Sequence, residues 1–265
     1  MPVMQGFSSH SFRKPRVVIL VIMLFLTKAS CAGVPILLYH RFGQQASDSM
    51  TVRTEAFESQ MNELERMGYH VIPLRRIVDY VAGHGPPPPP HSLAITVDDG
   101  HRSVYTDLLP IALRHRIPVT LFIYPSAISR ASYAMTWQQL HELQATGLFD
   151  IQSHTYWHPN FRQEKRRLDR EAYSRFVDMQ LVKSRQLLES RTGEKVDMLA
   201  WPFGIHDGEL QEHAIKAGYV AAFTMVRRAA NGKDNPMAIP RYLITDAVSK
   251  RAFLAIFKNG KDIRQ

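Results

Sequence analysis

The sequence predicts an α/β protein built on a parallel β-sheet that is either open or closed into a barrel. Short apolar runs alternate with helical patterns over about 200 residues, as in proteins whose parallel strands are connected by helices. The 265 residues are 45% hydrophobic and 22% charged, which is sufficient for one large core. We find no internal repeat, so one domain is the simplest organisation.

Seven short apolar runs predict strands. They are residues 35–39, 69–72, 93–97, 119–124, 149–153, 198–201 and 220–224. Six longer segments predict helices, namely residues 54–67, 74–81, 104–115, 136–145, 167–191 and 208–217. In the first helix, apolar residues recur every three or four positions from Phe57 to Met67, and Gly68 ends the pattern. The fourth helix opens with Thr136 and Gln139 at the spacing of a capping box.

Five consecutive prolines at positions 86–90 lie between the second helix and the third strand. Such a run predicts an extended, solvated segment, because proline lacks the N–H that helices and sheets require. We interpret it as a surface loop. A domain boundary or a ligand for a proline-binding module is the alternative.

The N-terminus has the layout of a secretory signal peptide, which we predict to span residues 1–32. A basic segment at 13–16 precedes an apolar run at 17–26, and small residues follow. This run is shorter than the ~20 residues that cross a bilayer, which favours cleavage, predicted after Ala32. The alternatives are an uncleaved membrane anchor and a lipid attached to Cys31, the only cysteine.

The net charge of +9 is partly a property of the predicted signal peptide. Residues 1–32 hold four basic residues and no acidic one, which leaves +5 for residues 33–265. That excess suits a neutral or anionic polymer, or a cell surface. Basic residues gather at 162–175, but acidic residues interleave with them, as on a solvated helix face. We find no nucleic-acid motif, so we expect no nucleic-acid partner, and membrane contact only through the signal or anchor segment.

Three clusters of polar or aromatic residues stand at the ends of predicted strands. Asp98 and Asp99 follow the third strand, His154 and His158 follow the fifth, and residues 201–204 stand at the end of the sixth. Parallel strands end at the same edge of a sheet or barrel, where α/β proteins place their active sites. We therefore expect the three clusters to meet.

Two histidines and one carboxylate form a metal-ligand set that leaves positions open for water and substrate. His154, His158 and one carboxylate of the aspartate pair can supply it, and the other carboxylate would remain free as a base. A divalent ion there would lower the pKa of water from ~15.7 towards ~7. Each motif alone has an ordinary interpretation: Asp-Asp-Gly is a common turn, and most of the 12 histidines are surface or packing residues.

Five segments resemble the motifs of one family, the polysaccharide deacetylases with NodB homology (carbohydrate esterase family 4). They are Val34-Pro35-Ile36-Leu37-Leu38-Tyr39-His40, Thr96-Val97-Asp98-Asp99-Gly100, Ser153-His154-Thr155-Tyr156-Trp157-His158-Pro159, Ala200-Trp201-Pro202-Phe203-Gly204 and Gly218-Tyr219. The resemblance extends from residue 34 to about residue 245. It implies one polysaccharide deacetylase domain at residues 33–265, folded as a distorted (β/α) barrel of about seven parallel strands.

The resemblance also implies a role for individual residues. Asp98 corresponds to the catalytic base, and the backbone N–H of Phe203 corresponds to the group that stabilises the oxyanion. The implied ligands of a divalent metal ion are Asp99, His154 and His158, and zinc is favoured over cobalt, nickel or iron. The expected substrate-binding residues are Tyr156, Trp157, Trp201, Pro202 and Phe203.

The sequence departs from the family pattern in three places, one of which is the absence of the aspartate–tryptophan pair that buttresses the acid histidine in other members. The third motif of many members begins with an arginine that orients the base, whereas Trp201 stands at that position here. No histidine follows His213, so the usual general acid is missing, which can cost ~10²–10⁴ in rate. These departures, with the ending Pro240-Arg241-Tyr242-Leu243-Ile244, resemble the branch that deacetylates poly-β-1,6-N-acetyl-D-glucosamine.

The sequence therefore predicts a metal-dependent hydrolase that removes N-acetyl groups from an exported N-acetylglucosamine polysaccharide. The alternatives are a peptidoglycan or chitin N-deacetylase, an O-acetyl xylan esterase, and a barrel that binds glycan without turning it over. We expect an exported protein, located in the periplasm, in the cell envelope or outside the cell. The expected partners are the polysaccharide and the machinery that exports it.

Overall fold

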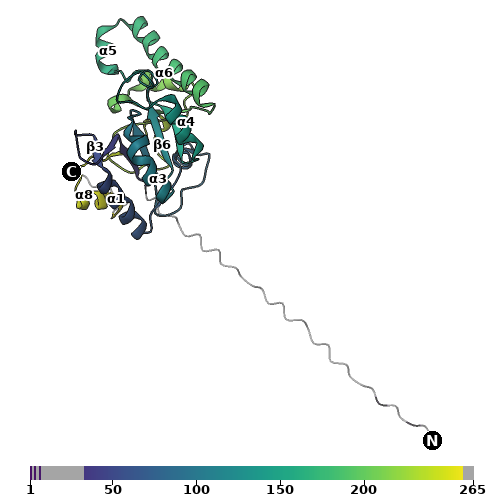
Figure 1. Cartoon of the computed structure of the whole chain (residues 1–265). Coiled ribbons are helices and arrows are strands. Elements are labelled where there is room, and N and C mark those ends of the chain that lie inside the picture. Colours follow the sequence, from purple (N-terminus) through teal and green to yellow (C-terminus); the bar gives the residue numbers. More distant parts are fainter. Residues whose placement is uncertain (2, 4–5, 7–32, 259–265) are drawn as a thin grey trace. The chain divides into compact units, whose positions relative to one another are not determined.

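The computed structural model describes residues 33–258, together with the isolated positions Met1, Val3 and Gly6 (Figure 1). Apart from those three positions, the predicted signal peptide lies outside the described residues, so its cleavage or lipidation stays a prediction. Among the described residues, no helix is both long and apolar enough to cross a bilayer. The described residues from Gly33 onward belong to one compact unit.

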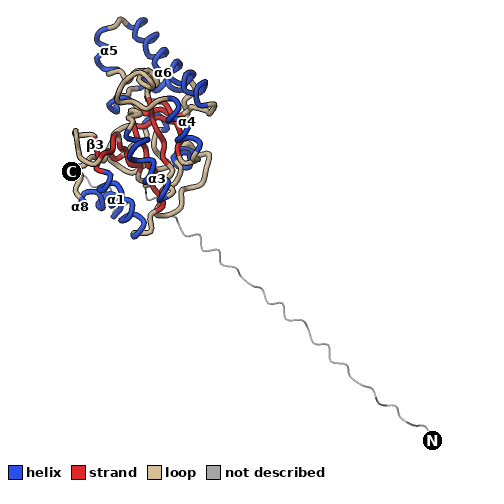
Figure 2. Tube along the Cα trace, viewed as in Figure 1, coloured by secondary structure: helices blue, strands red, loops and turns tan. Residues whose placement is uncertain are grey.

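A parallel sheet lies in the middle of this unit, with helices on its outside (Figure 2). Its strands are β1 (Ile36–Tyr39), β4 (His70–Val71), β5 (Ser92–Asp98), β6 (Val119–Ile123), β7 (Phe149–Ser153), β8 (Met198–Ala200), β9 (Ala221–Phe223) and β10 (Tyr242–Leu243). Seven strands follow the order β10-β1-β5-β6-β7-β8-β9, and β4 pairs with β5. Every one of these pairings is parallel. The predicted α/β class is confirmed.

The segment that leads into β10 joins the two edges of the sheet. Ile239 donates its N–H to the carbonyl of Ala222 (2.8 Å) and accepts the N–H of Thr224 (2.8 Å), so it pairs with β9. Three residues later, Tyr242 pairs with Leu37 in β1. The sheet therefore curves into a distorted barrel, as the family resemblance implied.

Eight α-helices lie in the described part of the chain (Figure 1). They are α1 (Thr54–Arg66), α2 (Leu74–Val81), α3 (Leu109–His115), α4 (Trp137–Ala145), α5 (Phe161–Arg167), α6 (Arg170–Thr192), α7 (Gly208–Lys216) and α8 (Lys250–Lys258). Three short turns, η1 (Val104–Leu108), η2 (Pro202–Gly204) and η3 (Pro236–Ala238), and a two-stranded parallel ribbon of β2 (Arg41–Gly43) and β3 (Thr51–Arg53) complete the fold. The predicted capping box is confirmed: Gln139 N–H donates to Thr136 Oγ1 (3.1 Å), and Thr136 N–H donates to Gln139 Oε1 (2.9 Å).

Two predicted helices differ from those observed. The helix expected at 104–115 opens as the π-helical turn η1, because Pro110 cannot donate a hydrogen bond to the carbonyl four residues back and its ring crowds that carbonyl. The helix expected at 167–191 begins later than predicted. The side chain of Asp169 accepts the N–H of Ala172 (2.8 Å), so α6 begins at Arg170, and α5 precedes it as a separate helix. The strands β2, β3 and β10 and the helices α5 and α8 were not predicted from the sequence.

The alternation of side chains along the strands divides the core into two buried clusters. One combines inward residues of the strands with four side chains of α2, and the other packs the outer faces of the strands against the remaining helices. Ala94 belongs to the inner cluster, and the period of two places Thr96 and Asp98 on the same face of β5. Asp98 therefore ends its strand pointing into the mouth of the barrel.

Candidate active site

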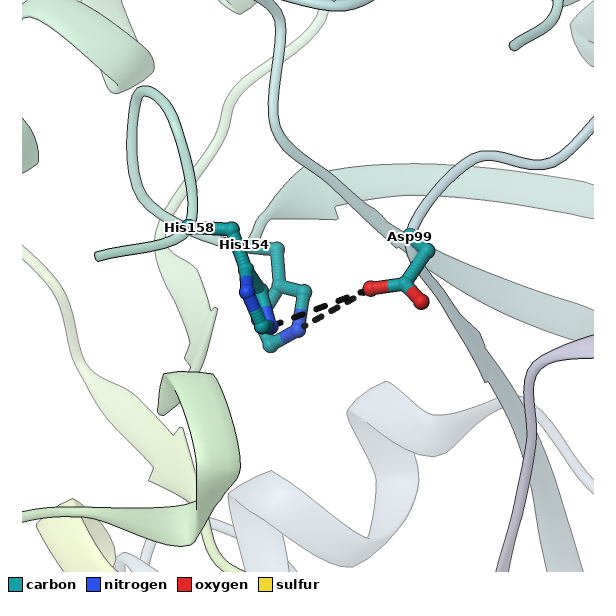
Figure 3. Close-up of side chains that lie close together, drawn as sticks. All are labelled: Asp99, His154 and His158. Atoms are coloured by element: carbon teal, nitrogen blue, oxygen red, sulfur yellow. Dashed lines mark ion pairs between the residues drawn. The ribbon is translucent and has the colours of Figure 1, made fainter. Parts of the chain in front are cut away.

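Asp99, His154 and His158 converge where β5 and β7 end. The Nε2 atoms of His154 and His158 lie 3.7 and 3.8 Å from Oδ1 of Asp99, and Figure 3 shows both rings facing that carboxylate. The three ligand atoms lie within 4.8 Å of one another, and no other group of His, Cys, Asp or Glu in the described residues meets this condition. A tetrahedral ion with bonds of ~2.1 Å separates its ligands by ~3.4 Å, so the residues present fit a divalent ion.

His154 is oriented by a hydrogen bond on the far side of its ring. Its Nδ1 lies 2.7 Å from the carbonyl of Ala200 in β8, so Nδ1 carries the hydrogen and Nε2 keeps a lone pair. Burial, with a contribution from the neighbouring His158, lowers the pKa of His154 to about 3. The imidazole is therefore neutral at neutral pH, which is the form that binds a metal ion.

His158 lies in an irregular loop and not on a helix. Burial lowers its pKa too, so this ring is also neutral near pH 7. Gln180 of α6 holds the loop by accepting the N–H groups of Tyr156 and Trp157, both at 3.1 Å. The second histidine is thus placed by a contact with a helix, and not by helical spacing.

Asp99 lies in surroundings that disfavour its own charge. Burial raises the pKa of Asp99, and the carboxylate of Asp98 raises it further, although His40 and Arg41 act in the opposite direction. A bound divalent cation would reverse this balance. The chain turns sharply here, with φ of 77° at Asp99 and 74° at Gly100, where a Cβ would lie only 3.0 Å from Ile123.

Asp98 is buried and paired with Arg241 through two hydrogen bonds of 2.8 Å each. Burial opposes ionisation, but the Arg241 guanidinium, together with His154 and His40, outweighs it, so the pKa of Asp98 lies below its usual value. Arg241 is fully buried and also donates to Thr96 Oγ1 and to the carbonyl of Thr224, both at 3.2 Å. Asp98 is therefore held ionised beside the two histidines, with its Oδ2 3.8 Å from Nε2 of His154.

This pair corrects the expectation that the arginine beside the base is missing. Arg241 does not come from the third motif, where Trp201 stands, but from the segment that leads into β10. The Pro-Arg-x-Leu-Ile ending was the sequence signal for it. That signal indicated a branch of the family but gave no indication of the contact.

Strained backbone concentrates at the same place. Seven non-glycine residues of the described chain have positive φ, and four of them are Asp99 (77°), Thr155 (65°), His158 (63°) and Phe203 (57°). Such conformations cost free energy and persist where the surrounding structure imposes them, often at functional sites.

Phe203 and Trp157 are the exposed aromatic residues of the predicted motifs, with 57% and 47% of their surface accessible. The Phe203 ring meets the His158 ring edge-on, with centroids 4.6 Å apart. Tyr156 is half-buried, and Lys183 Nζ lies 4.2 Å from the centre of its ring. Phe203 and Trp157 are thus accessible to a ligand next to the histidines.

Trp201 does not fit its predicted role in substrate binding. Its side chain is fully buried, its Nε1–H donates to the carbonyl of Met237 (3.0 Å), and its ring packs against Phe161. Pro202 is buried as well. These side chains support the backbone that carries Phe203, because an apolar ring gains more from burial in the core than from exposure at the barrel mouth.

His40 is a site residue to which the sequence analysis assigned no role. It follows β1, and it lowers the pKa of both Asp98 and Asp99, which places it beside the two carboxylates. Its Nδ1 is buried and has no hydrogen-bond partner among the described residues. The only sequence feature that could have pointed to His40 was its position at the end of the first family-like segment.

Residues 85–222 match the sequence profile described as polysaccharide deacetylase. The chain therefore belongs to the polysaccharide deacetylase family and carries the hydrolase domain of that family.

Two named relatives are similar to most of this chain. A poly-β-1,6-N-acetyl-D-glucosamine N-deacetylase of Escherichia coli (strain K12) is 25% identical over 257 residues, which cover 83% of this chain and 38% of that protein. A protein of the same name from Staphylococcus aureus (strain MRSA252) is 25% identical over 200 residues, covering 74% of this chain and 68% of that protein. The chain thus spans well under half the length of the E. coli relative.

Solved structures share the fold. The Streptococcus pyogenes deacetylase PplD, in complex with acetate, has a TM-score of 0.77 at 18% identity and covers 87% of this chain and 100% of its own. IcaB from Ammonifex degensii has a TM-score of 0.74 at 24% identity and covers 86% of this chain and 97% of its own. At these identities the likeness confirms the barrel and nothing finer.

Proposed function

We propose that this chain is a metal-dependent N-deacetylase of an exported N-acetylglucosamine polysaccharide, with poly-β-1,6-N-acetyl-D-glucosamine as the substrate. The observation that carries the proposal is the buried Asp98–Arg241 pair, which keeps a carboxylate ionised beside the Asp99, His154 and His158 group. A structural ion pair alone would not require two neutral histidines to face the same point.

In this proposal Asp98 is the base, and Asp99, His154 and His158 hold the metal ion, with zinc favoured and cobalt, nickel or iron as alternatives. A bound divalent ion would polarise the acetyl carbonyl and make water more acidic. Asp98 accepts a proton from the attacking water, whose oxygen bonds to the acetyl carbon.

The carbonyl oxygen gains negative charge, which the Phe203 N–H stabilises, and a single such donor can be worth ~10²–10³ in rate. The C–N bond then breaks. The sugar nitrogen takes up the proton that Asp98 accepted from water and leaves as an amine, and the acetyl group leaves as acetic acid, which ionises to acetate. Through its two hydrogen bonds, Arg241 keeps Asp98 aligned and ionised until it accepts the proton.

The substrate is assigned from the names of the relatives and from two features of the chain. No histidine follows His213, and Arg241 reaches the base from the segment before β10. The missing histidine and the ending at residues 240–244, which contains Arg241, both belong to the pattern that resembled the poly-β-1,6-N-acetyl-D-glucosamine branch. A chitin or peptidoglycan deacetylase and an acetyl xylan esterase would share the same site, so linkage must be tested directly.

The place of action follows from the predicted signal peptide at residues 1–32. We propose that the protein is exported to the periplasm, the cell envelope or the medium, where it meets the polymer and the export machinery. The apolar run at 17–26 is the support for this part of the proposal.

The test is acetate release from β-1,6- and β-1,4-linked N-acetylglucosamine oligomers, with and without a chelator. Asp98→Asn should lower the rate by ~10²–10⁴ without loss of the bound metal. Asp197→Asn is a matched control, because Asp197 is also buried and paired with an arginine, at the opposite ends of the strands. Wild-type activity in Asp98→Asn would exclude this base, and full activity after chelation would exclude a metal-dependent reaction.

A further inference from the structure

Three Phe, Tyr or Trp residues are exposed in the described chain: Tyr133 (40%), Trp157 and Phe203. Trp157 and Phe203 lie on the loops after β7 and β8, within the family-like motifs. Tyr133 lies on the loop between β6 and α4, and no motif of the sequence analysis includes it. All three therefore follow neighbouring strands whose ends form the candidate active site.

The Tyr133 loop is tied to the turn that carries the two aspartates. Met135 donates its N–H to the carbonyl of Gly100 (3.0 Å), and Arg102 donates its N–H to the carbonyl of Tyr133 (2.8 Å). A short antiparallel bridge between His101 and Ala134 lies between these two bonds. The position of the loop is therefore fixed relative to Asp98 and Asp99.

The ring of Tyr133 is held in place on two sides. It stacks on the imidazole of His101 with centroids 6.3 Å apart and planes only 8° from parallel. Its hydroxyl shares a hydrogen bond of 2.8 Å with the hydroxyl of Tyr124. His101 is itself fixed by Ser103, whose Oγ lies 2.8 Å from its Nδ1. An exposed ring with this much support loses little conformational freedom when a ligand covers it.

Tyr124 connects this ring to the candidate metal ligands. Its ring centroid lies 5.5 Å from that of His158, while Phe203 approaches the same histidine at 4.6 Å. The strand order β6-β7-β8 puts the loops of Tyr133 and Phe203 on either side of β7, and the loop after β7 carries His158. A linear polymer that crosses the site from one loop to the other would pass over the exposed part of Tyr133.

We propose that Tyr133, backed by His101, is a stacking surface for the sugar ring adjacent to the one that loses its acetyl group. A pyranose presents a face of C–H groups, which an aromatic ring covers both by burial of apolar surface and through its negatively charged face. This inference rests on the proposed function, because it assigns a second sugar of the same polysaccharide to the same site.

Binding measured without turnover tests it. The full chain carrying Asp98→Asn is titrated calorimetrically with a pentamer of β-1,6-linked N-acetylglucosamine. Adding Tyr133→Ala should weaken binding ~10-fold, the loss expected when ~55 Å² of apolar surface is no longer covered. Tyr133→Phe keeps the ring, and its affinity for the pentamer should stay within ~2-fold of that of the parent. Only the solvent-exposed hydrogen bond between the hydroxyls of Tyr133 and Tyr124 is lost. Leu113→Ala, which trims an exposed apolar side chain on α3, is the control and should leave binding unchanged.

A further variant, Tyr133→Leu, keeps apolar volume against His101 but lacks a flat face, so it should bind as weakly as the alanine variant. Undiminished binding by Tyr133→Ala would overturn the proposal. So would a Tyr133→Phe variant as weak as Tyr133→Ala, because the hydroxyl and not the ring would then matter. Absence of pentamer binding to the Asp98→Asn parent would also overturn it. Failure of the wild type to release acetate from the pentamer would refute the proposed function alone, since binding is measured separately.

Discussion

Replacing Arg241 by glutamine should raise the pKa of Asp98 and shift the acidic limb of the pH–activity profile upward. The two side chains form a bidentate pair, and both are almost completely inaccessible to solvent. Glutamine can still donate one hydrogen bond but carries no charge. It therefore removes the electrostatic contribution while it preserves much of the packing.

The size of the effect follows from the geometry of the pair. Two unit charges ~4 Å apart interact by ~4 kcal/mol at the effective dielectric constant of ~20 that suits protein sites. Since 1.36 kcal/mol corresponds to one pH unit, the pKa of Asp98 should rise by up to ~3. Breaking a buried ion pair at one partner typically costs ~3–5 kcal/mol of stability, which is of the same size.

The loss of stability should itself depend on pH. In the wild type the pKa of Asp98 is depressed, so its contribution is present above the unfolded value of ~3.9 and is lost as pH falls through the folded value. In Arg241→Gln the folded pKa exceeds the unfolded one. The stability deficit of the variant should therefore be complete near pH 8 and shrink as pH falls towards ~4.

Initial rates of acetate release between pH 4 and pH 9 measure the shift, and urea unfolding at two pH values measures the deficit. Arg241→Lys keeps a charge but loses the bidentate geometry. Its acidic limb and its stability should therefore lie between those of the wild type and of Arg241→Gln. Arg75→Gln is the control, because Arg75 pairs with the buried Asp197 at the other ends of the strands. If Arg241→Gln were folded and its acidic limb unmoved, the pairing would not set the charge of the base.

The remaining predictions concern the metal and the core. His154→Ala should abolish tight metal binding, because Nε2 of His154 faces Asp99. Elemental analysis measures the bound metal, and the control His115→Ala should keep it. Chelation should lower the Tm of the wild type, since a ligand at 100 times its Kd stabilises by ~2.7 kcal/mol, and an unchanged Tm in calorimetry would count against an ion. Trp201→Ala should reduce the free energy of unfolding by ~3–5 kcal/mol in urea titrations, because the ring is fully buried, and a loss under ~1 kcal/mol would contradict its place in the core.

Most strands and helices could be predicted because their signals are local. The capping box at Thr136 and the helix over residues 74–81 depend on neighbours within a few positions, and both agree with the structure. The errors arose where a local signal was ambiguous. Pro110 alters the start of one helix because it lacks an N–H, and Asp169 sets the start of another through its side chain. The spacing of apolar residues shows neither effect.

The short strands β2 and β3 were missed for a related reason. Each has three residues, too few to display a period of two, and each forms only by pairing with the other. Likewise, the side chain of Trp201 was predicted to face substrate, since its neighbours Pro202 and Phe203 belong to one motif. Whether a residue in such a motif points out or in depends on the turn, and φ of 57° at Phe203 turns that residue outward.

The candidate metal ligands could be predicted from sequence because they lie directly after strands, and parallel strands end at one edge. The positions of Asp98, Asp99, His154 and His158 directly after their strands therefore predicted a candidate site, and the structure brings these side chains together. The charge state of the base could not be determined in this way. Asp98 and Arg241 are 143 residues apart, and they meet only because the segment before β10 joins the two edges of the barrel. Closure of the sheet is a property of all its strands together, so the tertiary structure alone decided which arginine reaches the base.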